Sequence, residues 1–231
     1  MSLKDEITEM VSKIFWDQWT ERDGRVVPEA EDVPLGNEAV KFESATVLYA
    51  DMSGSTALVD SNAWYFAAEV YKTYLYCAAR IITNEGGTVT AYDGDRIMAV
   101  FIGDSPNSSA TRAALKINYG RIHIIMPLLQ KKYPLETFDL KHVVGIDRSS
   151  LRAARTGARG ANDLVWVGRA ANYAAKLTTL PDTHPTWITK DVYDRLTDDL
   201  KTTDGKPMWE IMTWTAMNSM TIYRSIWYWP I

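Results

Sequence analysis

The stretch Thr46-Val47-Leu48-Tyr49-Ala50-Asp51-Met52-Ser53-Gly54-Ser55-Thr56 carries the strongest indication of the fold. Its first half is a short, apolar, β-prone run that ends in Asp51, and its second half is a turn-like segment rich in Ser and Gly. A helical pattern then occupies about residues 60–84 and stops at Gly86-Gly87. We therefore expect a strand that places an aspartate at its end, followed by a loop and a long helix.

A second aspartate lies beside a hairpin signal. Residues 88–92 and 95–102 are both β-prone, and the Asp93-Gly94 pair between them is typical of a tight turn. If the strand before Asp51 pairs with the strand that begins at Asp95, the two carboxylates converge at one edge of a sheet. Either aspartate alone is more often a turn former or a helix cap. Together, on either side of the helix, they favour a functional site.

Two such carboxylates suit phosphoryl-transfer chemistry. Asp51 and Asp95 can hold two Mg²⁺ or Mn²⁺ ions per site, about 3.5–4 Å apart, as two-metal reactions require. The backbone N–H groups of the loop after Asp51 lead into a helix N-terminus, where phosphate oxygens bind well. The residues of this loop are Ser53, Gly54, Ser55 and Thr56. We expect metal binding at the aspartates and substrate binding at the loop.

The remaining pattern alternates strands and helices. We expect, in chain order, a helix at 107–132, a strand at 138–146, a strand at 164–167, a helix at 168–180, a strand at 186–189, a helix at 190–199, and two strands around Asn218-Ser219 within 208–229. This order predicts an α+β fold with an antiparallel-rich sheet flanked by helices. Residues 3–20 read as an amphipathic helix and 21–43 as a polar linker, so we expect an appendage at 1–43 and one catalytic domain at 44–231.

Composition limits the class of protein. The 231 residues are 46% hydrophobic and carry a net charge of −4, which disfavours a protein built chiefly to bind nucleic acid. No apolar run approaches the roughly 20 residues of a membrane helix, and Met1–Ile7 has no secretory signature. The single cysteine, Cys77, fits a reducing compartment. We therefore expect a cytoplasmic protein with no membrane partner.

A third informative stretch runs from Val167 to Leu177. Asn172 and Lys176 are four residues apart, so they share one face of a helix. An amide donor and a cation on one face can stabilise the charge that develops at a reacting phosphorus. A polar surface on an Ala-rich helix is the commoner role for such a pair.

In their order and spacing, the Asp51 block, the Gly94-Asp95 pair and the Val167–Leu177 block resemble class III nucleotidyl cyclases, over about residues 44–190. The resemblance implies a ferredoxin-like sheet and a head-to-tail homodimer with active sites at the interface. It implies two metals held by Asp51, Asp95 and the backbone carbonyl of Met52. It also implies a transition-state role for Asn172 of the partner chain, with Lys176 in place of the family's arginine.

Departures from that family point to the base. The adenine-selecting lysine and aspartate correspond to Ala91 and approximately Val165, and the guanine-selecting residues are absent. In this the chain resembles the pyrimidine cyclases of bacterial Pycsar anti-phage systems, which make cyclic CMP or cyclic UMP for a separate effector protein. The resemblance thus implies a nucleoside triphosphate substrate and such an effector as partners.

Two residues bear on the choice between uracil and cytosine. Tyr49 shares a strand face with Asp51 and can narrow the base pocket, although core packing explains it equally well. Arg96 only donates hydrogen bonds, which suits the O4 acceptor of uracil better than the N4 amine of cytosine. Regular alternation places Arg96 on the opposite face from Asp95, and a surface salt bridge is the alternative. We expect UTP, with CTP and ATP as alternatives.

The other features leave several functions open. Arg148, Arg152, Arg155 and Arg159 lie in an apparent loop that can bind a triphosphate or a regulatory nucleic acid, or be only solvated. A diguanylate cyclase or polymerase palm also pairs acidic residues on a sheet. A nucleotide sensor would bind the triphosphate without releasing pyrophosphate, and a dimerisation module would need neither aspartate.

Overall fold

The apolar run around Asp51 forms the end of a long strand, β2 (Glu38–Ser53), in the computed structural model. The structure describes residues 1–158 and 160–231 and divides into two units. Unit 1 comprises Met1–Ser44 and Ser150–Gly168, and unit 2 comprises Ala45–Ser149 and Arg169–Ile231. Among the described residues, none of the helices is both long enough and apolar enough to cross a membrane.

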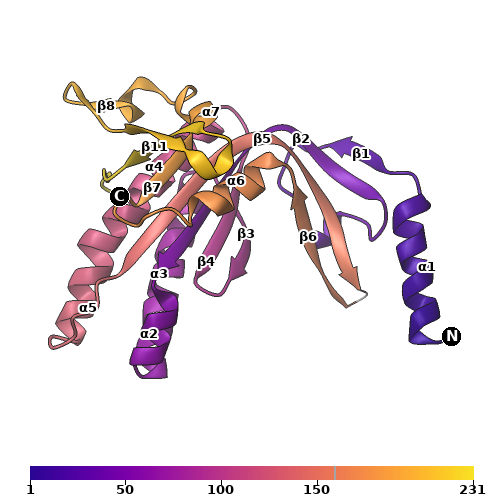
Figure 1. The fold of residues 1–231 in the computed structure, drawn as a ribbon, viewed down its shortest axis with the longest axis horizontal. Helices are drawn as coiled ribbons and strands as arrows, with labels where there is room; N and C mark the ends of the chain where they lie inside the picture. Colours follow the sequence, from indigo (N-terminus) through magenta and orange to yellow (C-terminus); the bar gives the residue numbers. More distant parts are fainter. Residues whose placement is uncertain (159) are drawn as a thin grey trace. The chain divides into compact units, whose positions relative to one another are not determined.

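Unit 2 carries most of the sheet, whose strand order is β10-β11-β7-β5-β2-β4-β3 (Figure 1). Four of the neighbouring pairs are antiparallel, and the pair β5–β7 is parallel. Besides its parts of β2 and of β5 (Lys141–Ala158), the unit contains the strands β3 (Thr88–Asp93), β4 (Arg96–Phe101), β7 (Thr186–Thr189), β10 (Glu210–Trp214) and β11 (Met220–Ser225), and the small hairpin of β8 (Thr202–Thr203) and β9 (Lys206–Pro207). Its α-helices are α2 (Ser55–Ser61), α3 (Trp64–Asn84), α4 (Pro106–Gly120), α5 (Met126–Lys132), α6 (Arg169–Leu177) and α7 (Lys190–Tyr193). It also contains the π-helix η2 (Arg121–Ile125) and the 3-10 helices η3 (Asp198–Leu200) and η4 (Thr215–Met217). The predicted α+β class and antiparallel-rich sheet are confirmed.

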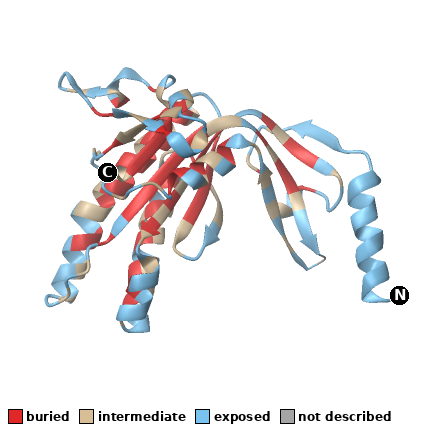
Figure 2. Cartoon of the chain, viewed as in Figure 1, coloured by how far each residue is buried: buried red, intermediate tan, exposed pale blue. Residues whose placement is uncertain are grey.

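Strand alternation sorts β2 and β4 into two faces. Leu48 and Ala50 of β2 and Ile97 and Ala99 of β4 belong to the main core, which includes the inward residues of α3 and α4. Figure 2 shows this burial along the central strands and the neighbouring helices. Because side chains alternate along a strand, Asp51 lies on the face of β2 opposite the one that meets this core.

The helix α6 packs closely on the sheet at a glycine. A Cβ atom on Gly145 of β5 would overlap the carbonyl oxygen of Ala174 and the side chain of Leu177. Leu177 also joins a second buried cluster with Trp187 and Trp214. Glycine at 145 therefore lets α6 approach the backbone of β5.

The hairpin turn lies one residue later than its sequence suggested. β3 ends at Asp93 and β4 begins at Arg96, so the two turn residues are Gly94 and Asp95. Gly94 has φ +61°, while Asp95 is not among the described residues with positive φ. A glycine at the first turn position is the requirement of a type II′ hairpin, and it places Asp95 in the turn rather than in the strand.

Unit 1 contains two departures from the expectations. It holds α1 (Leu3–Trp16), β1 (Thr20–Asp23), the 3-10 helix η1 (Ala30–Asp32), the first part of β2, the last part of β5, and β6 (Ala161–Val167). The stretch 21–43, expected to be a linker, instead supplies most of β1 and the start of β2, which pair in parallel. The stretch around Arg152, expected to be an irregular loop, forms the antiparallel pair β5–β6.

Three predicted helices differ in extent. The pattern at 60–84 forms α2 and α3, and the pattern at 107–132 forms α4, η2 and α5, with Pro127 at the start of α5. The pattern at 190–199 gives only α7 and η3. The strand at 186–189 and the two strands around Asn218-Ser219 are confirmed, and both turn residues have φ +55°.

Candidate active site

Strand register places three charged residues in one row. Asp51 of β2 lies opposite Arg96 of β4, and Arg96 lies opposite Asp93 of β3. Directly paired residues point to the same face of a sheet. The Arg96 guanidinium donates to Asp93 Oδ2 at 2.7 Å. The row therefore alternates carboxylate, guanidinium and carboxylate on the face away from the main core.

Tyr49 lies next to this row. The Arg96 Cζ atom is 5.5 Å from the centre of the Tyr49 ring, which is half-buried and lies opposite Met98. Burial raises the pKa of the Tyr49 hydroxyl, so the phenol is neutral near pH 7. Because Asp95 is a turn residue, the strand alternation expected between Asp95 and Arg96 does not apply, and the ion pair of Arg96 with Asp93 confirms the alternative of a salt bridge. Arg96 lies on the same face as Asp51 and Tyr49.

The charge of Asp95 acts on the Asp51 carboxyl. Burial raises the pKa of the Asp51 carboxyl, and the charge of Asp95 raises it further. Thr178 Oγ1, just after α6, donates to Asp51 Oδ2 at 3.5 Å. Asp95 Oδ2 is buried and has no hydrogen-bond partner in the described part of the chain. A buried carboxylate oxygen without a partner beside a second carboxylate is the arrangement that a cation would stabilise.

A purely protein-built metal cage is absent from the described residues. They contain no group of three or more His, Cys, Asp and Glu side chains that could hold an ion. Magnesium sites on nucleotides commonly use one or two carboxylates and fill the remaining positions with phosphates and water. The Met52 side chain is buried in the main core, so only its backbone carbonyl is available as a ligand.

The loop after Asp51 is shorter than expected. Ser53 ends β2, Gly54 alone separates it from α2 with φ +75°, and Ser55 and Thr56 form the first turn of that helix. The Leu58 N–H donates to the Gly54 carbonyl at 3.0 Å. The segment therefore presents the N-terminus of α2 directly beyond the strand that carries Asp51.

The helix α6 carries the other two predicted site residues. Asn172 and Lys176 are both exposed, one turn apart. Lys176 Nζ lies 3.8 Å from Met217 Sδ, and within the described chain neither residue is hydrogen-bonded to Asp51 or Asp95. One chain thus places Asp51 and Asp95 beside Arg96 and Tyr49, while no hydrogen bond of the described residues joins Asn172 or Lys176 to the aspartates.

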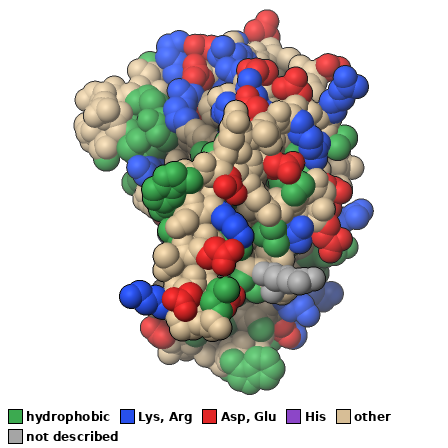
Figure 3. All heavy atoms as spheres, turned by 90° about the vertical axis from the view of Figure 1, so that its right-hand side faces the viewer, with side chains coloured by type: hydrophobic (Ala, Val, Ile, Leu, Met, Phe, Trp, Pro, Cys, Tyr) green, Lys and Arg blue, Asp and Glu red, His purple; other side chains and the backbone are tan. Residues whose placement is uncertain are grey.

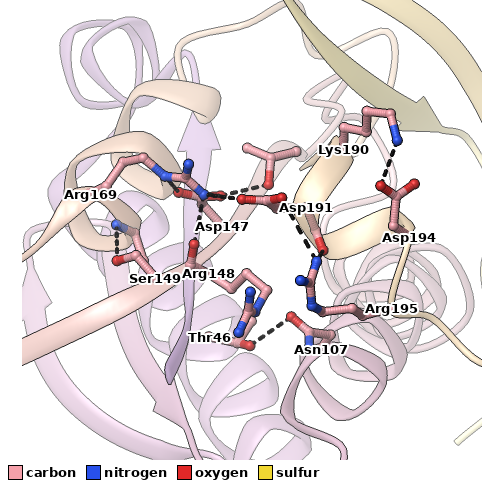
Figure 4. A network of polar contacts seen from close by, with 12 residues as sticks. Thr46, Asn107, Asp147, Arg148, Ser149, Arg169, Lys190, Asp191, Asp194 and Arg195 are labelled. Atoms are coloured by element: carbon pink, nitrogen blue, oxygen red, sulfur yellow. Dashed lines mark hydrogen bonds and ion pairs between the residues drawn. The ribbon is translucent and has the colours of Figure 1, made fainter. Parts of the chain in front are cut away.

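Sequence reasoning missed a polar network at the N-terminus of α6 (Figure 4). Arg169, the first helical residue, reaches the fully buried Asp147 of β5 at 3.1 Å and Asp191 of α7 at 2.6 Å. Thr189 Oγ1 donates to Asp147 Oδ1 at 2.6 Å. The available signal was an aspartate at the end of the apolar run 143–146, a position where an unpaired charge is costly.

The arginines expected in one flexible loop have separate surroundings. Arg152 Nε donates to Glu21 Oε2 at 2.7 Å, and Arg155 Nε donates to Asn162 Oδ1 at 2.7 Å, all within unit 1. Arg148 belongs to unit 2, and Arg159 lies outside the described residues. On the face drawn in Figure 3, basic and acidic side chains lie intermixed.

Curated relatives match the chain along its length. A Xanthomonas perforans protein named uridylate cyclase is 56% identical over 232 residues, covering 100% of both chains. A Burkholderia cepacia protein of the same name is 51% identical over 232 residues, again covering 100% of both. A third, from Rhodovulum sp. (strain MB263), is 38% identical and covers 99% of this chain and 98% of its own. No protein-family model matches the chain.

Solved structures share the fold. The adenylyl cyclase CyaB from P. aeruginosa superposes with a TM-score of 0.63 at 20% identity, covering 81% of this chain and 95% of its own. The guanylate cyclase domain of RhGC from Catenaria anguillulae gives a TM-score of 0.66 at 15% identity, covering 80% and 97%. These likenesses establish the fold of a class III cyclase catalytic domain. With full-length relatives at 56% and 51% identity, the chain belongs to the uridylate cyclase family.

Proposed function

We propose that this chain converts UTP into 3′,5′-cyclic UMP and pyrophosphate. The observation that carries the proposal is the row of Asp51, Arg96 and Tyr49 on one sheet face, beside the unpartnered buried oxygen of Asp95. A row of this kind offers carboxylates for a metal–triphosphate group and a fixed cation for a base. The printed names of the full-length relatives agree with this choice of substrate.

The reaction needs no nucleophile from the protein. The 3′-hydroxyl oxygen of the ribose attacks the α-phosphorus, the bond from that phosphorus to the bridging oxygen breaks, and pyrophosphate leaves. The hydroxyl proton passes to solvent or to a phosphate oxygen. The chain's task is therefore to position the two reacting atoms in line and to stabilise charge.

The acidic residues fit divalent cations. Asp51, Asp95 and the Met52 carbonyl would hold Mg²⁺ or Mn²⁺, two ions per site, with the triphosphate completing the coordination. When bound, the ions would lower the pKa of the 3′-hydroxyl and neutralise the triphosphate. Ser53, at the end of β2, and the first N–H groups of α2, from Gly54 through Ser55 and Thr56, would receive phosphate oxygens.

Arg96 and Tyr49 are the residues we assign to uracil. Asp93 fixes the Arg96 guanidinium, which can only donate hydrogen bonds and so matches the O4 acceptor of uracil. The amine of cytosine at the same position would meet a second donor. The adjacent Tyr49 ring offers an apolar surface against which the base can pack. Ala91, which pairs with Met98 opposite Tyr49, offers no polar group for adenine.

The remaining site residues come, in our proposal, from a second copy. A head-to-tail homodimer would bring the exposed Asn172 and Lys176 of one chain to the aspartates of the other. The Asn172 amide would donate to the α-phosphoryl oxygens as charge develops, and Lys176 would supply a cation. Lys176 lacks the two-pronged geometry of an arginine, so we assign it charge neutralisation rather than orientation.

We also propose the biological setting. The single cysteine is free, which suits the reducing cytoplasm. Cyclic UMP would act as a second messenger that a separate effector protein reads, in defence against phage. Residues 44–231 would form the catalytic domain and residues 1–43 an appendage to it.

The test is product analysis of the purified full-length protein. ATP, GTP, CTP and UTP are each incubated with it and Mn²⁺, and the products are identified by mass spectrometry. Cyclic UMP from UTP, formed with one pyrophosphate per turnover, is the expected result. Cyclic AMP, cyclic GMP or cyclic CMP in its place would overturn the base assignment. Binding of triphosphate without pyrophosphate release would instead identify a nucleotide sensor.

A further inference from the structure

The first residue of α6 is unfavourable for the helix that it begins. Arg169 places a cation at a helix N-terminus, where the backbone dipole favours negative charge. A residue that breaks a local rule in this way is expected to have a compensating role elsewhere. The contacts of Arg169 show what compensates it.

Arg169 joins α6 to two neighbouring elements, β5 and α7. Its Nε and Nη2 atoms donate to Asp147 at 3.1 and 3.3 Å, and its Nη2 atom donates to Asp191 Oδ2 at 2.6 Å and to the Arg148 carbonyl at 2.8 Å. Asp147 is fully buried, and its Oδ1 atom, which accepts from Arg169, also accepts from Thr189 Oγ1 at 2.6 Å. Figure 4 shows Asp147, Arg148 and Asp191 around the Arg169 guanidinium. We name Arg169, Asp147 and Asp191 the α6 clamp.

The clamp lies one helical turn from a predicted catalytic residue. Asn172 follows Arg169 by three residues, and residues three or four apart neighbour each other on a helix surface. The Arg169 guanidinium also lies 5.5 Å from the ring of Tyr173, which packs edge-on against Trp214 at 5.9 Å. These contacts fix the position of α6 along its axis and its rotation about that axis. Both determine the direction in which Asn172 points.

We propose that Arg169 is a positioning residue for cyclisation: through the α6 clamp it fixes the direction in which Asn172 faces the substrate. The proposal rests on the proposed cyclase function and adds a residue to its machinery. The two-pronged contact with Asp147 requires a planar guanidinium, so a lysine would keep the charge and lose the orientation.

The test measures kcat and KM for UTP in two kinds of variant. Arg169→Ala alone would leave Asp147 buried and unpaired, so it is made together with Asp147→Asn. Arg169→Lys is the milder change and keeps the charge if the first pair folds poorly. We expect kcat to fall by about 10–100-fold in the first pair, with KM within about threefold, because misplacing a transition-state group affects the chemical step. Lys190→Ala, which removes an exposed cation of α7 that pairs with Asp194, is the matched control.

The decisive measurement combines these changes with Asn172→Ala. If the clamp acts through Asn172, removing it from an Asn172→Ala protein should lower kcat by less than about twofold. A purely structural role would instead multiply the two losses and would overturn the proposal. A wild-type kcat in either Arg169 variant would also overturn it. If wild-type protein forms no cyclic nucleotide, the proposed function fails, and the positioning role fails with it.

Discussion

At the edge formed by β2 and β4, the strand register places Asp51 opposite Arg96, with Tyr49 beside them. Thr178 is hydrogen-bonded to Asp51, and Asp93 is hydrogen-bonded to Arg96. On α6, by contrast, Asn172 and Lys176 are exposed, and Arg169 one turn earlier carries the contacts. We call these two regions the sheet half and the helix half. The sheet half is assembled by backbone pairing, and the helix half depends on side-chain contacts at one end.

This difference has a consequence for how the site works. Strand register is fixed by many backbone hydrogen bonds, so the sheet half is preformed in each chain. The first turn of α6 is oriented by one ion-pair cluster, so a single substitution there can redirect Asn172. Since no hydrogen bond of the described residues joins Asn172 or Lys176 to the aspartates, catalysis in our proposal depends on a second copy to join the two halves.

The largest effect is expected from removing the sheet half's carboxylates. Asp51→Ala or Asp95→Ala should lower kcat for UTP by about a thousandfold or more, because several kcal/mol of charge stabilisation are lost. Circular dichroism and the oligomeric state should not change, because both side chains are partly exposed. The exposed Asp104 after β4 supplies the control as Asp104→Asn, and full activity in either alanine variant would contradict the metal assignment.

A heterodimer of two inactive variants tests directly whether the halves come from different chains. Asp51→Ala and Asn172→Ala chains with different tags are co-expressed and purified over both tags. In a head-to-tail dimer one of the two sites then has both halves intact, so about half of the wild-type rate should return.

The matched control pairs Asp51→Ala with Asp95→Ala. Both changes affect the sheet half, so each site of that heterodimer lacks one carboxylate and the protein should stay inactive. Equal recovery in both heterodimers, or in neither, would show that the halves do not combine across chains.

Substitution of Arg96 should change the choice of base more than the chemistry. Arg96→Met removes a charged hydrogen bond worth about 1.5–3 kcal/mol, so kcat/KM for UTP should fall about 10–150-fold. The value for CTP should change much less, since its amine gains nothing from a donor. Competition between UTP and CTP, read by mass spectrometry, measures the ratio. Arg195→Met, at an exposed position two residues after α7, should keep the wild-type ratio, and a preserved ratio in Arg96→Met would remove Arg96 from base recognition.

The sheet half could be predicted from the sequence, because its signals are local. An apolar run ending in Asp51 and a glycine turn next to Asp95 are short-range features that backbone pairing turns directly into structure. The error concerned one residue of the turn, and it changed the face assigned to Arg96. The turn could use either Asp93 and Gly94 or Gly94 and Asp95. The choice depends on the register in which β4 pairs with β3, and local sequence does not specify that register.

The helix half and the hairpin β5–β6 were harder to predict. Arg169 and Asp147 are 22 residues apart in the chain and meet only because α6 packs on β5 at Gly145. The second half of β5 is rich in Arg, Ser and Ala, which have little strand preference, so its pairing with β6 overrode the local signal. Long-range contacts of this kind decide in which direction Asn172 and Lys176 face.

The smallest expected effect is on the free energy of unfolding rather than on catalysis, and it concerns the core-facing side of β5. His142 is fully buried against Tyr74, its two ring nitrogens have no partner among the described residues, and burial lowers its pKa to about 3. The unfolded chain takes up a proton near pH 6.5 while the folded chain does not, so stability falls as pH drops from 6.5 toward 3. Between pH 7 and pH 5 this one residue should cost about 2 kcal/mol of unfolding free energy.

His142→Phe, similar in shape, should lose that part of the pH dependence in urea titrations and keep the wild-type kcat at pH 7. The exposed His123, as His123→Phe, should retain the full dependence. Equal slopes in the two variants would mean that His142 is not the source of the acid sensitivity.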